Sequence, residues 1–332
     1  SAATSSLQGI DVARFSNEDV AADVVDAVRA LGLPRIDLIS GTDQTHAAFA
    51  LLRDHADLLR TLTLVNPEAP DMSSGQLVLS FKEAMERYAD LCRANPTCNA
   101  ALPDPLGRWR QLYEELQATP SLQSGQLPDG TRFSMVVDGD RGASALEVAV
   151  GSVPLTPYLH LTLTGEPAAA AAGNAYQKGD TSALVPTGAD LSDICHRLWP
   201  HDAAIDGDWI RRFPEYRSGR FRLVAESCDA WNVPIASKRF RSAVVSDVPT
   251  TIVVGRLSTA TNAAAVDGIL RGLDRAVLFA FPSLGFAPMF DAPSCFPALW
   301  RTWLADPAKA PSQADVDACV ASTPPVTFFG SS

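Results

Sequence analysis

The chain has 332 residues, of which 46% are hydrophobic and 20% are charged, and its formal net charge is −11 at pH 7. This length and hydrophobic content predict a globular protein with a sizeable core and more than one lobe. The acidic excess argues against a nucleic-acid partner, because phosphate contacts need clustered Lys and Arg. No run of about 20 apolar residues occurs, so no transmembrane segment is expected.

A short apolar stretch, Ile36–Ile39, runs into a tight turn and then into a helical pattern that begins near Thr45. Strand, turn and helix in this order are the layout of a nucleophile elbow, in which Gly-x-Ser-x-Gly holds a strained serine at the turn. The five elbow positions here are Ser40-Gly41-Thr42-Asp43-Gln44, so threonine replaces the serine and both outer glycines are absent. We expect the layout of an elbow without its chemistry.

Other stretches extend this comparison along the chain. A helical pattern over 14–32 precedes the elbow, an apolar strand pattern over 249–255 lies far downstream, and a Cys-x-x-Trp sequence ends at Trp231. In this order they resemble the secreted tripeptidyl-aminopeptidase-like (TAP-like) branch of the α/β-hydrolases, relatives of the proline iminopeptidases. The resemblance covers nearly the whole chain. It implies an α/β fold with a mostly parallel sheet and a helical lid insertion.

The patterns divide the chain into three parts, in which residues 1–71 and 245–332 form the α/β core and residues 72–244 form the lid. The core parts carry strand patterns that resemble the fifth to eighth strands of the hydrolase sheet, so this chain carries the second half of that sheet. A cysteine-bracketed helix is expected at the end of the chain. In the lid, Pro and Gly separate the expected helices, which lie at 77–94, 106–119, 143–150, 154–163 and 168–177.

Six cysteines, an even number, fall along the chain as Cys92 and Cys98, Cys195 and Cys228, and Cys295 and Cys319. We expect three disulfides and therefore a secreted or periplasmic protein, with six free buried thiols as the alternative. No metal site is expected, because no Cys-x-x-Cys occurs and the histidines do not cluster with the cysteines. No cofactor is expected either.

Serine-type hydrolysis needs a nucleophile, a base and a carboxylate, which follow one another in α/β-hydrolases as nucleophile, acid and histidine. The resemblance puts the acid where Ser258 stands and the histidine where Phe286 stands. The last histidine in the chain is His201, so no imidazole follows the strand pattern at 249–255. The triad positions Thr42, Ser258 and Phe286 are thus degenerate, and no catalytic residue is expected.

The histidines offer one alternative. His46 would be the base for an unconventional Thr42 nucleophile, although four residues into the following helix it is expected to point away from the Thr42 hydroxyl. His196 and His201 are expected in surface or capping roles, because no partner constellation surrounds them in the sequence.

The leading hypothesis is a catalytically inactive secreted pseudo-hydrolase that works as a binding or assembly subunit. The alternatives are an active serine-type-like peptidase or esterase, with catalytic groups rearranged or supplied by a partner chain, and a purely structural part of an envelope assembly. The family carries further strands before the one at 36–39, so this strand is expected at an open edge. We therefore expect another polypeptide, a cleaved precursor piece or a separate subunit, to supply the missing N-terminal strands. A shortened chain, or a smaller sheet closed by residues 1–10, is the alternative.

Overall fold

The computed structural model describes residues 11–126, 132–152, 156–165, 188–198, 208–209, 211–217 and 227–328. Within these residues one parallel sheet has the strand order β1-β2-β5-β6. Its strands are β1 (Ile36–Gly41), β2 (Leu59–Val65), β5 (Thr250–Gly255) and β6 (Ala276–Phe281). The expected α/β class with a parallel sheet is confirmed, and strands consecutive in the expected order are neighbours in space.

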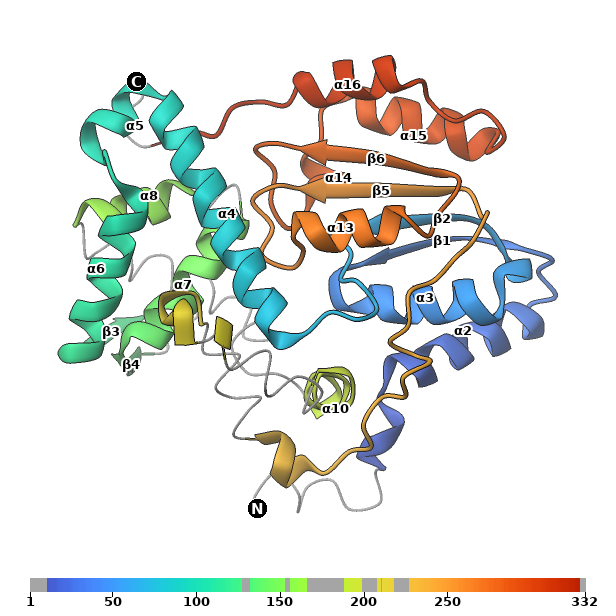
Figure 1. Ribbon diagram of the computed structural model, residues 1–332, viewed down its shortest axis with the longest axis horizontal. Coiled ribbons are helices and arrows are strands. Elements are labelled where there is room, and N and C mark those ends of the chain that lie inside the picture. Colours follow the sequence, from blue (N-terminus) through green and yellow to red (C-terminus); the bar gives the residue numbers. More distant parts are fainter. Residues whose placement is uncertain are drawn as a thin grey trace.

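Helices cover both faces of this sheet (Figure 1). On one face lie α2 (Asn17–Ala30), α3 (Thr45–Asp54) and α13 (Ala263–Leu270), and on the other lie α15 (Cys295–Ala305) and α16 (Gln313–Ala321). All six residues of β5 are buried, as expected for a parallel strand covered on both sides. Its side chains alternate between the layers, because Ile252 and Val254 join the first core and Val253 joins the second.

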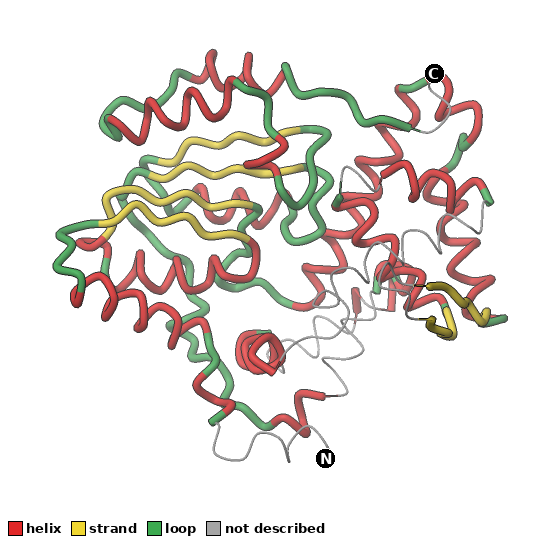
Figure 2. The backbone as a smooth tube through the Cα atoms, turned by 180° about the vertical axis from the view of Figure 1, so that it is seen from behind, coloured by secondary structure: helices red, strands yellow, loops and turns green. Residues whose placement is uncertain are grey.

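A second group of helices lies beside the sheet, at the left of Figure 1. It has its own core, in which Trp109 and Phe81 are buried. Val326 and Phe328 of the C-terminal tail also belong to this core, and Figure 2 shows the tail crossing from the sheet layers to the helical group. The helices of the group are α4 (Ser74–Ala94), α5 (Pro96–Ala101), α6 (Pro105–Ala118), α7 (Gly139–Gly151) and α8 (Thr156–Thr164).

Two expectations about secondary structure are wrong. The lid was expected to be helical, but an antiparallel hairpin of β3 (Ser121–Gln126) and β4 (Arg132–Val137) interrupts it (Figure 2). The cysteine-bracketed terminal helix is two helices, α15 and α16, because Pro307 and Pro311 lie between them and proline breaks a helix interior. The helix expected at 168–177 lies outside the described residues.

Several short elements complete the described chain. Helix α10 (Gly188–Arg197) is seen end-on below α3 in Figure 1. The others are α14 (Pro288–Asp291) and the 3-10 turns η1 (Val12–Arg14), η2 (Thr42–Gln44), η3 (Ala56–Leu58) and η6 (Pro214–Tyr216).

Three disulfides link neighbouring elements. Cys92–Cys98 joins α4 to α5, Cys195–Cys228 joins α10 to the segment before Trp231, and Cys295–Cys319 joins α15 to α16. Disulfides of this kind persist in oxidising compartments. Within the described ranges, no helix has both the length and the apolar character that crossing a membrane requires.

Candidate functional site

The three positions that the resemblance assigns to a triad lie at the carboxyl end of the sheet, because parallel strands all end on the same side. Thr42 follows β1, Ser258 follows β5, and Phe286 follows β6. The loops that carry Ser258 and Phe286 touch, since the Leu257 N–H donates to the Leu284 carbonyl at 2.9 Å. Among the described residues, no hydrogen bond joins Thr42 to either of the other two positions.

Thr42 has the strained backbone of an elbow. Its φ is 48°, in the left-handed region that a β-branched residue rarely adopts. A local hydrogen bond stabilises the turn, because the hydroxyl of Thr45, the first residue of α3, donates to the Thr42 carbonyl. The Thr42 hydroxyl donates to Asp43 Oδ1 at 2.9 Å. The expected layout of strand, tight turn and helix is thus present, with a carboxylate as the partner of the hydroxyl.

At position 42 we expect a glycine variant to be more stable than an alanine variant, which reverses the usual preference for alanine over glycine. Thr42→Gly should be about 1 kcal/mol more stable than Thr42→Ala, because a Cβ in the left-handed region costs about 1–2 kcal/mol and both variants lack the hydroxyl. Urea unfolding of the two variants measures the difference. Ala22→Gly, at an exposed site in α2, is the control and should lose about 1 kcal/mol. Equal stability of the two position-42 variants would mean that the turn is not left-handed.

The end of β2 carries a residue that the sequence analysis missed. Asn66 is fully buried and also has a positive φ, of 44°. Its side-chain amide donates to the carbonyls of Gly285 and Phe286 at 3.0 and 3.1 Å, and its Oδ1 accepts from the Gly255 N–H at 2.9 Å. Asn66 therefore ties the end of β2 to the end of β5 and to the loop after β6.

The loop after β6 is also fixed to the helical group. The Phe286 N–H donates to the Gly151 carbonyl, at the end of α7, at 2.6 Å. The approach needs glycine on both sides, since a Cβ on Gly285 would lie 1.8 Å from the Gly151 oxygen and a Cβ on Gly151 would lie 2.3 Å from the Phe286 ring. At the position where the resemblance places a catalytic histidine, Phe286 therefore joins the loop after β6 to the helical group.

Ser258 is buried and has a local role. Its N–H donates to the Gly255 carbonyl at 2.9 Å, and its hydroxyl accepts from the Ala260 N–H at 3.3 Å. The cavity beside it, also lined by Asn262, has a volume of about 20 Å³, which is room for about one water molecule. A larger hollow of about 370 Å³ lies near Arg53 and His55, at the end of α3 opposite to Thr42.

Beneath the elbow lies a buried cluster of charged side chains. Arg197, on α10, is only 2% exposed and pairs with Glu68 and, at 2.7 Å from its Nε, with Asp193. Asn17, on α2, donates to the other oxygen of Asp193 at 2.6 Å and to the Asp43 carbonyl at 3.3 Å. The cluster fixes α10 against α2 and the segment that follows β2.

The cluster keeps Arg197 charged and holds His46. Burial alone would lower the pKa of Arg197, but the Glu68 and Asp193 carboxylates outweigh it and raise the pKa above its usual value. His46 Nε2 lies 3.2 Å from Arg197 and 3.4 Å from Glu68, and its ring stacks on Phe240 at 6.2 Å. Within the described part of the chain, His46 makes no hydrogen bond to Thr42, and its Nδ1 has no hydrogen-bond partner.

Neither His160 nor His196 completes a triad in the described structure. His196 was expected in a surface or capping role without partners, but it is 8% exposed and bridges the Pro234 carbonyl and the Glu18 carboxylate at 2.6 and 3.1 Å. His160 lies in the helical group beside the Cys92–Cys98 disulfide. His201 lies outside the described residues.

No protein-family model matches the chain, and no curated protein matches it. Solved structures similar to it include an alpha/beta hydrolase enzyme from a Medee basin deep-sea metagenome library, with 12% identity, a TM-score of 0.39, and coverage of 90% of this chain and 74% of that one.

Two further structures are similar. A hydrolase from Pseudomonas aeruginosa is 13% identical, with a TM-score of 0.37 and coverage of 89% and 72% of the two chains. An alpha/beta hydrolase fold protein from Chitinophaga pinensis is 13% identical, with a TM-score of 0.37 and coverage of 88% and 72%. Likeness at this level carries no conclusion about activity, substrate or partners.

Proposed function

We propose that this chain is a catalytically inactive relative of the secreted TAP-like α/β-hydrolases and acts as a binding or assembly subunit. The observation that carries the proposal is in the loop after β6, where a hydrolase of this fold needs its histidine. Phe286 stands there, its N–H donates to the Gly151 carbonyl of the helical group, and the sequence has no histidine after His201. Without an imidazole at this loop, the fold lacks its usual base.

The surroundings of Thr42 support the same proposal. Its hydroxyl donates to Asp43, while His46, the nearest histidine in sequence, is held by Arg197 and Glu68 beneath the elbow. Substitution of a triad member typically lowers turnover by several orders of magnitude, and here all three positions differ from the hydrolase pattern. Turnover that depends on Thr42 would overturn the proposal.

One observation favours the second candidate, an active hydrolase with rearranged groups. Backbone strain such as that at Thr42 is often kept at functional sites, and the hydroxyl of Thr42 lies 2.9 Å from a carboxylate that could accept its proton. In this candidate Thr42 is the nucleophile and Asp43 is the base. It predicts that Asp43→Asn lowers turnover as strongly as Thr42→Ala.

For the binding role, we propose that another polypeptide pairs with β1 and extends the sheet. β1 is an edge strand of the described sheet, and none of its six residues is buried, whereas all six of β5 are. Ile39, near its carboxyl end, is 51% exposed. A strand with open backbone donors and acceptors and an exposed apolar side chain is a template for a further strand.

The partner proposal predicts a complex that Ile39→Lys weakens. Protein purified under native, non-reducing conditions should have a mass above the 35.3 kDa of the chain and release a second polypeptide on denaturation. Ile39→Lys should raise the dissociation constant at least about tenfold, because it puts a charge against an apolar interface. Leu122→Lys, at an exposed site on β3, is the matched control and should leave the dissociation constant unchanged. A lone 35.3 kDa chain would contradict the partner proposal.

A further inference from the structure

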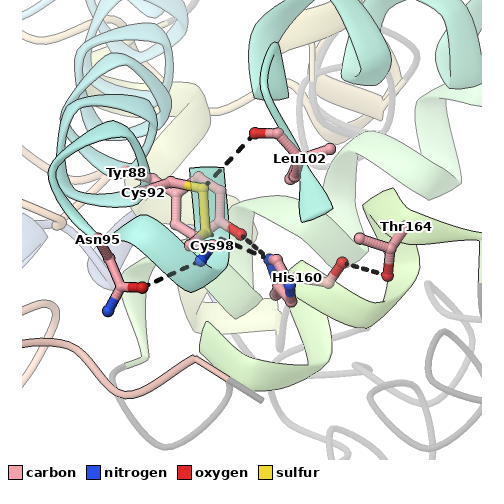
Figure 3. The surroundings of a disulfide bond; sticks show 7 residues. All are labelled: Tyr88, Cys92, Asn95, Cys98, Leu102, His160 and Thr164. Atoms are coloured by element: carbon pink, nitrogen blue, oxygen red, sulfur yellow. Dashed lines mark hydrogen bonds between the residues drawn. A yellow bond between two sulfur atoms is a disulfide. The ribbon is translucent and has the colours of Figure 1, made fainter. Parts of the chain in front are cut away.

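Two cysteines and a histidine meet in the core of the helical group (Figure 3). Cys92 comes from the end of α4, Cys98 from α5, and His160 from α8. Their exposed fractions are 0%, 0% and 3%. His160 Nδ1 lies 3.5 Å from Cys98 Sγ. The expectation that no histidine clusters with the cysteines is therefore wrong for His160.

The ligand atoms of these three residues have the spacing of a metal site. All of them lie within 4.8 Å of one another. In a tetrahedral zinc site, bonds of about 2.3 Å to sulfur and about 2.05 Å to nitrogen put the two ligand atoms about 3.6 Å apart, close to the 3.5 Å between Cys98 Sγ and His160 Nδ1. Two thiolates on one zinc ion lie about 3.8 Å apart. The Cα atoms of Cys92 and Cys98, 5.1 Å apart, permit that separation once the disulfide is open.

The side chain of Tyr88 also lies against the imidazole. Its hydroxyl oxygen is 3.3 Å from His160 Nδ1, the ring nitrogen that faces Cys98 Sγ. A metal ion binds the unprotonated nitrogen of a neutral imidazole.

The other two disulfides have different surroundings. Cys195 and Cys228 pack in an apolar cluster with Ile194 and Leu198, and Cys295 Sγ lies 3.4 Å from the Ser322 hydroxyl. Across the described ranges, Cys92, Cys98 and His160 form the one group of three His, Cys, Asp or Glu side chains with metal-site spacing.

We propose that Cys92, Cys98 and His160 bind zinc when the Cys92–Cys98 disulfide is reduced. A dithiol reductant supplies two electrons and two protons, so the S–S bond breaks, two S–H bonds form, and the reductant itself becomes a disulfide. Zinc then displaces the two thiol protons and bonds both sulfurs and Nδ1. These three residues supply three of the four ligands of a tetrahedral site, and a water molecule would take the fourth position. The oxidised protein offers no thiolate and binds no zinc there.

Reduction and zinc binding would replace the disulfide crosslink by a metal crosslink between more distant parts of the chain. The disulfide joins α4 to α5, which are adjacent in sequence. The zinc ion would join both of them to α8, more than 60 residues further along the chain. The helical group would therefore keep a covalent-strength crosslink under reducing conditions. This inference does not depend on whether the chain hydrolyses anything.

Zinc titration of the full chain tests the proposal. The protein is reduced with dithiothreitol, which is then removed without oxygen, and bound zinc is counted by native mass spectrometry while circular dichroism follows helix content. We expect one zinc per reduced chain and none per oxidised chain. His160→Gln, which keeps both thiols, should weaken zinc binding at least about tenfold. The Cys195→Ser/Cys228→Ser double variant, which keeps the site, should still bind one zinc.

The absorption of cobalt in place of zinc reports the ligands directly, and we expect thiolate-to-cobalt charge transfer that Cys92→Ser reduces. Equal zinc affinity of wild type and His160→Gln would overturn the proposal, because the zinc would then be bound by thiols alone. Loss of binding in the Cys195→Ser/Cys228→Ser variant would also overturn it. A reduced chain that loses its helical signal and binds no zinc would do the same, since the site needs the native packing.

Discussion

Arg197→Met is expected to lower the free energy of unfolding by about 3–5 kcal/mol, because it leaves the buried Glu68 and Asp193 carboxylates without their cation. Both carboxylates are at most 10% exposed, so solvent cannot replace the guanidinium. Urea unfolding at neutral pH measures the loss. Methionine preserves most of the side-chain volume, which separates the loss of charge from the loss of packing.

The matched control is Arg93→Met, at an exposed i,i+3 pair with Asp90 whose side chains are 64% and 59% exposed. Exposed pairs contribute little, so we expect a change below about 1 kcal/mol. Neutralising the whole cluster in Arg197→Met/Glu68→Gln/Asp193→Asn should recover part of the loss, since no uncompensated charge is left. A loss below about 1 kcal/mol in Arg197→Met alone would mean that α10 does not dock on the elbow through these charges.

Gly285→Ala is expected to destabilise the protein by about 3 kcal/mol or more. The new Cβ would lie 1.8 Å from the Gly151 carbonyl oxygen and 2.5 Å from its carbon. Both are backbone atoms at the end of α7, so no side chain can turn aside, and the cost reaches the upper range for overpacking. The shift would also break the hydrogen bond from Phe286 to Gly151. Chemical unfolding again gives the magnitude.

Gly268→Ala is the control for this substitution. Gly268 lies in α13, and its added Cβ would meet nothing closer than an Arg271 nitrogen at 3.7 Å. Alanine in a helix interior is favoured over glycine by about 1 kcal/mol, so the control should gain stability while Gly285→Ala loses it. Equal effects of the two variants would contradict the close contact between the β6 loop and α7.

The sheet could be predicted because each of its strands has a local sequence pattern that indicates a strand. The residues of β5, between Pro249 and Gly255, are β-branched or apolar throughout, which indicates a strand covered on both faces whatever its neighbours are. The hairpin β3–β4 was missed because polar residues such as Gln123 and Ser124 weaken its alternation. The Asp129-Gly130 pair in the sequence was the available turn signal.

The contacts around the candidate site could not be predicted in the same way. Asn17 pairs with Asp193, 176 residues further along the chain, and Glu68 pairs with Arg197, 129 residues further along. In the sequence alone, a polar residue on a helix indicates a solvated face, because its distant partner is not known. Asn66 did carry a local signal, since an asparagine before Pro67 at a strand end tolerates the left-handed region. Its three hydrogen-bond partners depend on loops about 190–220 residues away.

The central claim is that this fold has no working nucleophile at its elbow, and steady-state turnover tests it most directly. The purified protein is assayed on p-nitrophenyl esters and amino-acid p-nitroanilides beside Thr42→Ala and Asp43→Asn, with unfolding curves to show that each variant folds. We predict that wild type and both variants give the same rate, equal to that of the substrates alone. Turnover by wild type that Thr42→Ala abolishes would contradict the claim, and an equal loss in Asp43→Asn would identify the threonine and carboxylate as the catalytic pair.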